Sequence, residues 1–301
     1  MTIAAGALLL AALAGAALVL MLAGPATAEA KKIRVTPGKN AIQRAVNTAR
    51  PGDVLRIKDG RYRESVVIDK RLTLRGIGNQ RPTIDGRCKT NITVAVTAGG
   101  VKLKQLKVVG AAEGFGFSPS QVDFRFLGKG KANDLVLRET CDGLEAAEYG
   151  VNLLGVRKVT VANSLAKGGH TDAGFYVGGV TGTGNGKTVL KGNRAFGNTV
   201  GIVMEQSRGD IRVLDNNIHD NTAPGVHDPG GILVNVAIGS LYEDNRVVRN
   251  GLYGIDLVPG SDSNVLNGNT FTGNEIDVID EGTGNCGSAN TIGSGPAFPA
   301  C

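Results

Sequence analysis

A glycine followed by alternating apolar residues recurs five times between Gly150 and Val258. The segments start 24, 27, 30 and 23 residues apart and read GVNLL, GFYVG, GIVME, GILVN and GIDLV. This alternation is the period of a β-strand with one buried face. The segments are too short for helices, and the links between them lack helical periodicity. Units in which a helix joins two strands are therefore not expected.

A second series of turns that contain asparagine runs in phase with the first. Its members are ANSLAKGG from Ala162, GNRAFGN from Gly192, NNIHDN from Asn216, DNRVVRN from Asp244 and GNTFTGN from Gly268. Repeats of about 20 to 30 residues with short strands are typical of a parallel β-solenoid, whose coils bury their apolar faces by stacking. Asparagine at one corner of successive coils can form side-chain ladders. An antiparallel β-sandwich also fits short strands and glycine-rich turns, but two series in phase favour the solenoid.

Alternation also predicts which side chains share a face. If the residue after each leading glycine points inward, the core contains Val151, Phe175, Ile202, Ile232 and Ile255. One outward row then contains Asn152, Tyr176, Val203, Leu233 and Asp256. A second contains Leu154, Gly178, Glu205, Asn235 and Val258, and a third contains Glu148, Asp172, Thr199, Pro229 and Leu252.

The N-terminal residues 1–28 carry no charged side chain and end in GPATA before Glu29. A long apolar run before a small-x-small sequence is typical of a signal peptide. We expect cleavage after Ala28, no membrane span after cleavage, and a secreted or cell-envelope location. The alternative is an uncleaved anchor, because the run from Ile3 to Ala23 is almost long enough to span a bilayer.

Four cysteines in an exported chain suggest two disulfides, for which three pairings exist. Cys286 and Cys301 bracket a tail rich in glycine and serine that has no long strand of its own. Closing that loop would stabilise the end of the chain, and Cys88 with Cys141 follows by elimination.

The segment before the repeats predicts a cap for the solenoid. Asn40 precedes AIQRAVNTA, which places Ile42 and Val46 on one face of a short helix capped by Asn40 and ended before Pro51. An open first coil would expose both core and sheet edge, which this helix would cover. The expected organisation is a cap over 29–53, a β-solenoid over 54–280, and a tail closed by a disulfide over 281–301.

The run AIQRAVNTARPGDVLRIKDGRYRESVVIDKRLTLRG, followed by these coils, resembles secreted proteins of the pectate-lyase-like superfamily. DAGFYVG from Asp172 and DEGTGNCGSANT from Asp280 resemble a bacterial branch of it. The resemblance implies an all-β, right-handed parallel β-helix across the mature chain. It leaves function open, because the superfamily includes lyases, epimerases, hydrolases and binding modules.

The formal net charge of +6 favours an acidic partner, such as an acidic polysaccharide. Lysine and arginine are scattered and no nucleic-acid motif is present, so nucleic acid is not expected as a partner. We expect a monomer. Residues Ala111–Asn133 interrupt the repeat, and we interpret them as an insertion that is either part of a binding face or a cover for the sheet.

The candidate site lies where carboxylates share an outward face. Glu148 and Asp172 should be neighbours in adjacent coils, Tyr176 and Glu205 should follow, and His170 should lie at the edge. Two close carboxylates can share a proton or bind calcium, so Glu148 and Asp172 are the candidate calcium ligands. With Tyr176 or His170 as base, the group could serve a polysaccharide lyase or epimerase.

The alternative reading is a non-catalytic glycan-binding module of the cell envelope, in which these acids are ordinary solvated side chains. Lys187 and Arg208 are the candidates for a positive charge near the substrate. The sequence contains no P-loop and no HExxH, and its three histidines lack the spacing of a zinc or copper site. His227-Asp228-Pro229 has the order opposite to the Asp-Pro-His triplet of mannuronan epimerases, so those roles are not assigned to it.

Overall fold

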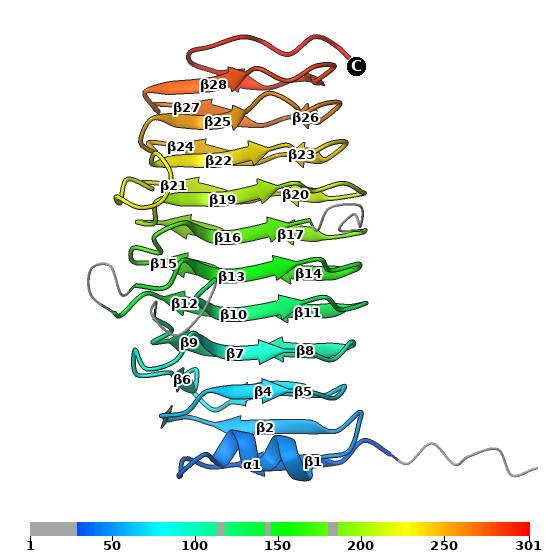
Figure 1. Ribbon diagram of the computed structural model, residues 1–301, viewed down its shortest axis with the longest axis vertical. Helices are drawn as coiled ribbons and strands as arrows, with labels where there is room; N and C mark the ends of the chain where they lie inside the picture. Colours follow the sequence, from blue (N-terminus) through cyan, green and yellow to red (C-terminus); the bar gives the residue numbers. More distant parts are fainter. Residues whose placement is uncertain (1–28, 113–117, 142–145, 180–185) are drawn as a thin grey trace, which may run out of the picture.

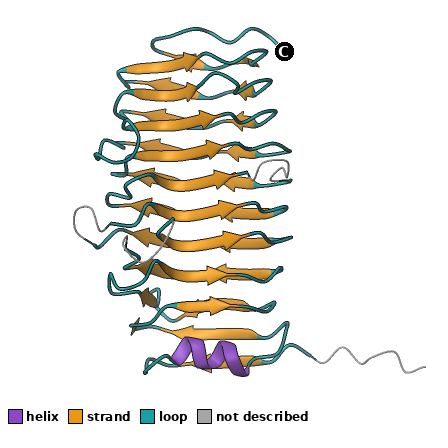
Figure 2. Cartoon of the chain, in the orientation of Figure 1, coloured by secondary structure: helices purple, strands orange, loops and turns teal. Residues whose placement is uncertain are grey.

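The chain winds into a stack of coils that form three parallel sheets, as Figures 1 and 2 show. The computed structural model describes residues 29–112, 118–141, 146–179 and 186–301. Within them, sheet A has 11 strands, sheet B has 10 and sheet C has 9, and every pairing between named strands is parallel. The predicted all-β parallel solenoid with one short helix is confirmed.

Sheet A consists of β1 (Lys32–Val35), β2 (Val54–Lys58), β5 (Thr73–Ile77), β8 (Val101–Lys104), β11 (Gly130–Asn133), β14 (Val159–Ala162), β17 (Val189–Lys191), β20 (Arg212–Leu214), β23 (Leu241–Glu243), β26 (Val265–Asn267) and β29 (Cys286–Ser288). Sheet B consists of β3 (Arg61–Tyr62), β6 (Thr83–Asp85), β9 (Lys107–Val109), β12 (Val136–Arg138), β15 (Leu165–Lys167), β18 (Arg194–Phe196), β21 (Asn217–His219), β24 (Arg246–Val248), β27 (Thr270–Thr272) and β30 (Thr291–Ile292). Sheet C consists of β4 (Val66–Ile68), β7 (Ile92–Val96), β10 (Ser120–Arg125), β13 (Tyr149–Leu154), β16 (Ala173–Gly178), β19 (Val200–Glu205), β22 (Gly230–Asn235), β25 (Tyr253–Leu257) and β28 (Ile276–Asp280).

The predicted inward row lies in the core. Its five members pair in register across β13, β16, β19, β22 and β25, and each is at most 1% exposed. The glycine before each member is required by its neighbour in the next coil. A Cβ on any of these glycines would lie 3.0 Å or less from a backbone carbonyl oxygen of that coil. The repeated glycine therefore marks the point where successive coils approach most closely.

Asparagine ladders stabilise the corners between the sheets. In one of them, each side-chain amide donates to the side-chain oxygen of the next coil at 2.9 to 3.1 Å. Its members are Asn193, Asn216, Asn245, Asn269 and Asn290. A second ladder joins Asn198, Asn221, Asn250 and Asn274. The same oxygens accept backbone N–H groups, so the buried corners leave few polar groups unpaired.

Helix α1 (Ala41–Thr48) lies at the N-terminal end of the stack and contacts β1, β2 and β4. Ile42 and Val46 are fully buried, as the helical pattern predicts. The predicted role of Asn40 is wrong, because this residue has left-handed backbone angles and makes no side-chain capping bond. Glu64 accepts the N–H groups of Ile42 and Gln43 instead, at 3.0 and 2.9 Å.

Residues 118–133 are not an insertion. They contain β10 and β11, which pair on both sides with regular strands of sheets C and A. Val122 and Phe124 point into the core and are fully buried. Phe124 therefore fills the core, and β10 keeps the alternation of a regular strand. Residues 113–117 of the predicted insertion lie outside the described ranges.

Sheet pairing extends beyond both predicted limits of the solenoid, 54 and 280. Strand β1 pairs with β2 at one end, and β29 and β30 continue sheets A and B at the other. At the C-terminal end the asparagine ladder continues to Asn290, which provides the corner for this additional coil. The predicted signal peptide, residues 1–28, lies outside the described ranges. Among the described residues, no helix has the length and apolar character needed to cross a membrane.

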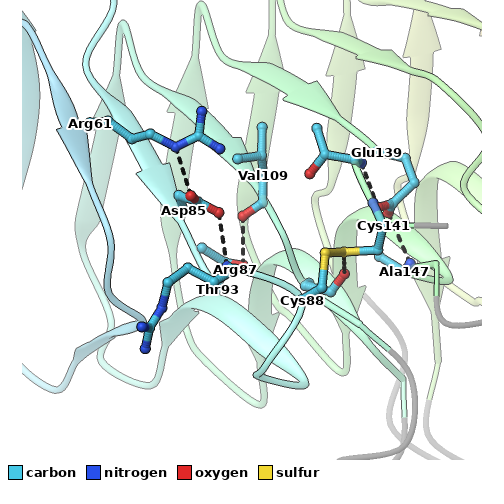
Figure 3. Close-up of a disulfide and its surroundings, with 11 residues drawn as sticks. Arg61, Asp85, Arg87, Cys88, Thr93, Val109, Glu139, Cys141 and Ala147 are labelled. Atoms are coloured by element: carbon cyan, nitrogen blue, oxygen red, sulfur yellow. Dashed lines mark hydrogen bonds and ion pairs between the residues drawn. A yellow bond between two sulfur atoms is a disulfide. The ribbon is translucent and has the colours of Figure 1, made fainter.

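Both predicted disulfides are present, Cys88–Cys141 and Cys286–Cys301. Figure 3 shows the first of them beside the carboxylate of Glu139. That carboxylate accepts the N–H groups of Thr140 and Cys141 at 2.6 Å and of Ala147 at 2.9 Å. The disulfide and Glu139 therefore anchor Cys141, which follows β12, and Glu139 also anchors Ala147, which precedes β13.

Candidate functional site

The candidate residues lie on the outward face of sheet C. Asn152, Tyr176, Val203, Leu233 and Asp256 pair in register on successive strands, and so do Leu154, Gly178, Glu205 and Asn235. Adjacent strands of a sheet are about 4.8 Å apart. The rows predicted from the sequence therefore bring Tyr176 and Glu205 to neighbouring strands.

Tyr176 and Glu205 form a hydrogen-bonded pair. The Tyr176 hydroxyl donates to Glu205 Oε2 at 2.6 Å, and Asn235 Nδ2 donates to Glu205 Oε1 at 3.3 Å. The ring of Tyr176 lies 4.6 Å from that of Tyr149, between centroids, and occupies the place that a side chain at Gly178 would need. Burial, together with the hydrogen bond to Glu205, raises the pKa of Tyr176 and keeps its hydroxyl protonated.

Asp172 is a buried carboxyl beside a histidine. Its Oδ1 lies 3.4 Å from His227 Nε2, and its side chain is 8% exposed compared with 33% for His227. The Tyr149 hydroxyl donates a hydrogen bond to Asp172. Burial raises the pKa of Asp172, as does the charge of Glu205, while His227 and Tyr149 act in the opposite direction.

The loop before β22 carries His227 to this position. Val226 N donates to Thr171 O at 2.7 Å, so the loop folds back onto the turn before β16. Gly225 makes this possible, because a Cβ there would overlap the carbonyl oxygen of Thr171 and the hydroxyl of Thr199. His227 was not among the residues predicted for the site. The sequence does indicate an extra loop here. The step from Gly201 to Gly231 is 30 residues, the longest of the four steps between the leading glycines, and it contains this loop.

His170 does not lie beside the other candidates. It is fully buried, and its Nδ1 lies 2.6 Å from Asn198 Oδ1 at the start of the second asparagine ladder. Burial lowers its pKa to about 4, so the ring is neutral at physiological pH. The sequence placed His170 at the edge of the face, but the turn before β16 directs it inward. Glu148 lies one coil before Asp172, and its carbonyl oxygen accepts the N–H of Asp172 at 3.2 Å.

The outward face is more covered than the alternation suggests. Val203 is 1% exposed and belongs to a second apolar cluster outside the main core. The buried members of that cluster are Tyr149, Ala173, Val200, Val203, Leu233 and Tyr253. Val203 lies in the outward row as predicted, but it is not exposed to solvent, because the other side chains of this cluster cover it.

The two cations predicted near the site make other contacts. Lys187 Nζ is 4.0 Å from Asp210 Oδ2, and Arg208 forms an isolated backbone bridge with Ile238. Calcium at Glu148 and Asp172 stays a prediction. No group of three or more His, Cys, Asp or Glu side chains able to hold a metal ion occurs in the part of the chain that the structure describes.

Solved structures with the same architecture include polysaccharide lyases. Pectate lyase Pel9A has a TM-score of 0.65 at 13% identity, over 89% of this chain and 78% of that one. A rhamnogalacturonan lyase has a TM-score of 0.53 at 11% identity, over 89% of this chain and 86% of that one. At these identities the likeness shows the fold alone, and it confirms a pectate-lyase-like parallel β-helix.

The sequence model of one protein family matches residues 124–292, which is more than half of the chain. That family is described as "Periplasmic copper-binding protein (NosD)". A comparison with curated proteins finds no match.

The side chains that the structure describes do not fit a copper site. All four cysteines are in disulfides, and Met204 is buried in the core. Of the three histidines, His170 is fully buried, and His227 pairs with Asp172. His219 accepts a hydrogen bond from Arg194 at 2.9 Å and lies 2.5 Å from Asp220. No two of these histidines lie in one metal-binding group within the described ranges.

Proposed function

Because the chain belongs to the family described as periplasmic copper-binding protein (NosD), we propose that it works outside the cytoplasm. We further propose that it acts on an acidic polysaccharide by acid–base chemistry at the outward face of sheet C. The described residues do not fit copper, so no step of this proposal involves it. Two disulfides are consistent with an oxidising compartment.

The observation that carries the proposal is the pair formed by Asp172 and His227. The exposed partner is the imidazole and the buried partner is the carboxyl. With Nε2 facing Asp172, Nδ1 of His227 is the ring nitrogen left for a substrate. At 3.4 Å the contact between Nε2 and Asp172 Oδ1 is not a hydrogen bond in this structure. When Nε2 donates to the buried carboxylate, the imidazole takes the tautomer with an unprotonated Nδ1, which is the form that acts as a base. In this role Asp172 is a positioning residue, which explains why it is buried.

The reaction class follows from a base and a protonated tyrosine that both lie near Asp172. His227 Nδ1 takes the proton α to a uronate carboxylate, and Tyr176 supplies a proton. In a lyase, the electrons of the broken C–H bond form a double bond and expel the glycosidic oxygen, which Tyr176 protonates. In an epimerase, a proton returns to the same carbon from the opposite side. Glu205, which accepts the Tyr176 hydroxyl at 2.6 Å, holds that side chain in place.

A non-catalytic glycan-binding module is the second candidate. The observation in its favour is that Asp172 is buried beside the apolar cluster around Tyr149. This burial restricts the access of a substrate to the Asp172 carboxyl. In that case the Asp172–His227 pair only anchors the loop before β22.

One experiment separates the two. Purified protein is incubated with polygalacturonate and with alginate, and the reaction is followed by ultraviolet absorbance of the unsaturated uronate and by incorporation of solvent deuterium. His227→Gln should lower the rate by at least about 100-fold, since general base catalysis contributes that much. Val226→Ala, a change at an exposed residue of the same loop, should leave the rate unchanged. Binding without product or deuterium exchange would support the non-catalytic module.

A further inference from the structure

We propose that the outward face of the N-terminal half of sheet A binds a linear acidic polysaccharide laid along the axis of the solenoid. The first observation is a row of four cations in register. Arg34, Arg56, Arg75 and Lys104 occupy the same position on the consecutive strands β1, β2, β5 and β8. The row ends at Asn133 of β11. Strand spacing places one positive charge about every 4.8 Å.

A second group of cations lies on the same face, nearer the starts of the strands. Lys102 and Lys131 are register partners on β8 and β11. They line an open groove of about 1100 Å³ together with Lys31, Arg71, Lys129 and Lys158. The acidic residues lining the groove are Glu29 and Asp53. Asp53 is committed to the backbone, because it accepts the N–H groups of Lys31 and Arg50 at 2.8 Å.

These cations are not neutralised within the protein. Among the described residues, no carboxylate lies within 4.0 Å of the side-chain nitrogens of Arg34, Arg56, Arg75, Lys102, Lys104, Lys129, Lys131 or Lys158. Arg75 Nε donates to the neutral side chain of Gln105 at 3.1 Å, which orients the guanidinium without cancelling its charge.

The later coils of the same sheet are built differently. Lys187 and Arg212 pair with Asp210, and Lys191 pairs with Asp215 at 3.2 Å. Like charges directly opposite each other on adjacent strands destabilise a sheet. In the first coils this electrostatic repulsion between neighbouring strands is not relieved, whereas in the later coils carboxylates neutralise the cations. The unpaired positive charge is therefore specific to the N-terminal half of the face. An anionic ligand that neutralises the row accounts for the difference.

The shape of the surface selects the kind of ligand. The row is straight and crosses the strands at right angles, which suits one extended chain with a charge on each repeating unit. A duplex nucleic acid, whose phosphates wind around an axis, fits a straight row less well. Arginine forks bind carboxylates in bidentate fashion. Phe126 is 65% exposed and lies in the segment between β10 and β11 that also contains Lys129, and an exposed ring can stack on a sugar.

This inference rests on the proposed function only for the choice of polymer, because binding at sheet A requires neither His227 nor Asp172. The test is the dissociation constant of the full chain for polygalacturonate at low and at physiological salt. The variant Arg56→Gln/Arg75→Gln/Lys104→Gln should bind about tenfold more weakly, the loss expected for a few exposed charge pairs. Its matched control is Lys187→Gln/Lys191→Gln/Arg212→Gln, which removes the same charge from the later coils of the same sheet.

The control should change affinity less than about twofold, because the remaining row is intact. Equal losses in the two triple variants would mean that only net charge matters and would overturn the proposal. Equal or tighter binding of single-stranded DNA or polyphosphate would overturn the assignment to a polysaccharide. If no product forms but the row variant alone loses binding, the proposed function fails and this inference stands.

Discussion

His227 Nε2 lies 3.4 Å from Asp172 Oδ1, although the two residues belong to different coils. The contact joins a partly exposed imidazole to a carboxyl that is almost inaccessible to solvent. It depends on the loop before β22, whose backbone bonds to Thr171. Regular stacking of the strands would not bring these two residues together. Asp172 occupies a position of the repeat, whereas His227 belongs to a loop that departs from it.

The burial of both faces of sheet C predicts that neighbouring positions of β19 are sensitive to charge. Ile202→Asp should prevent folding, because a lone buried carboxylate costs several kcal/mol against a marginal total stability. Val203→Asp should be similarly damaging, since Val203 is 1% exposed within the cluster around Tyr149. Soluble expression and thermal unfolding measure this. A melting temperature of Val203→Asp close to that of the wild type would contradict the described packing.

The C-terminal disulfide should stabilise the last coil. Cys286 and Cys301 enclose a separation of 15 residues, for which the chain-entropy model gives about 3 kcal/mol. Cys286→Ser/Cys301→Ser should lower the free energy of unfolding by up to that amount, as measured in urea. Titration of the unfolded, unreduced wild-type chain should find no free thiol. Two reactive thiols would contradict one of the disulfides, and four would contradict both.

His170 should affect stability and not activity. Its pKa is lowered to about 4, so the folded protein holds it neutral while the unfolded chain protonates near pH 6.5. The stability it contributes is present above about pH 6.5 and is lost as the pH falls towards 4. Burial raises the pKa of Glu139 to about 7. Its contribution to the free energy of unfolding therefore changes with pH in the opposite direction over this range. The informative quantity is therefore the difference between His170→Gln and wild type.

That difference in unfolding free energy should shrink as the pH falls from 7 to 4.5, because the wild type loses its advantage there. At pH 7 the variant should retain full turnover or glycan binding. A large loss of turnover with unchanged unfolding would return His170 to the list of catalytic candidates.

Most of the fold that was predicted correctly is the part that repeats. The inward position of Ile202 and the register of Tyr176 follow from a period of two, which every coil obeys. Asn216 and its ladder partners follow from a corner that recurs at the same place. His227 could not be placed, because its contact with Asp172 is made by a loop that occurs in one coil. His170 was misplaced because alternation does not hold through the turn before β16.

The last prediction concerns Asp172→Asn. An amide has almost the same shape as the carboxyl, and its oxygen can still accept the Tyr149 hydroxyl, so the melting temperature should change little. The amide no longer selects the tautomer of His227 that leaves Nδ1 unprotonated. We therefore expect kcat on the acidic polysaccharide to fall by at least about 100-fold while KM changes little, the pattern of an interaction needed in the transition state. Val226→Ala is the control in the same loop. A rise in KM of about 100-fold with kcat preserved would show that Asp172 contributes to substrate binding alone. Full activity of the variant would remove Asp172 from the site.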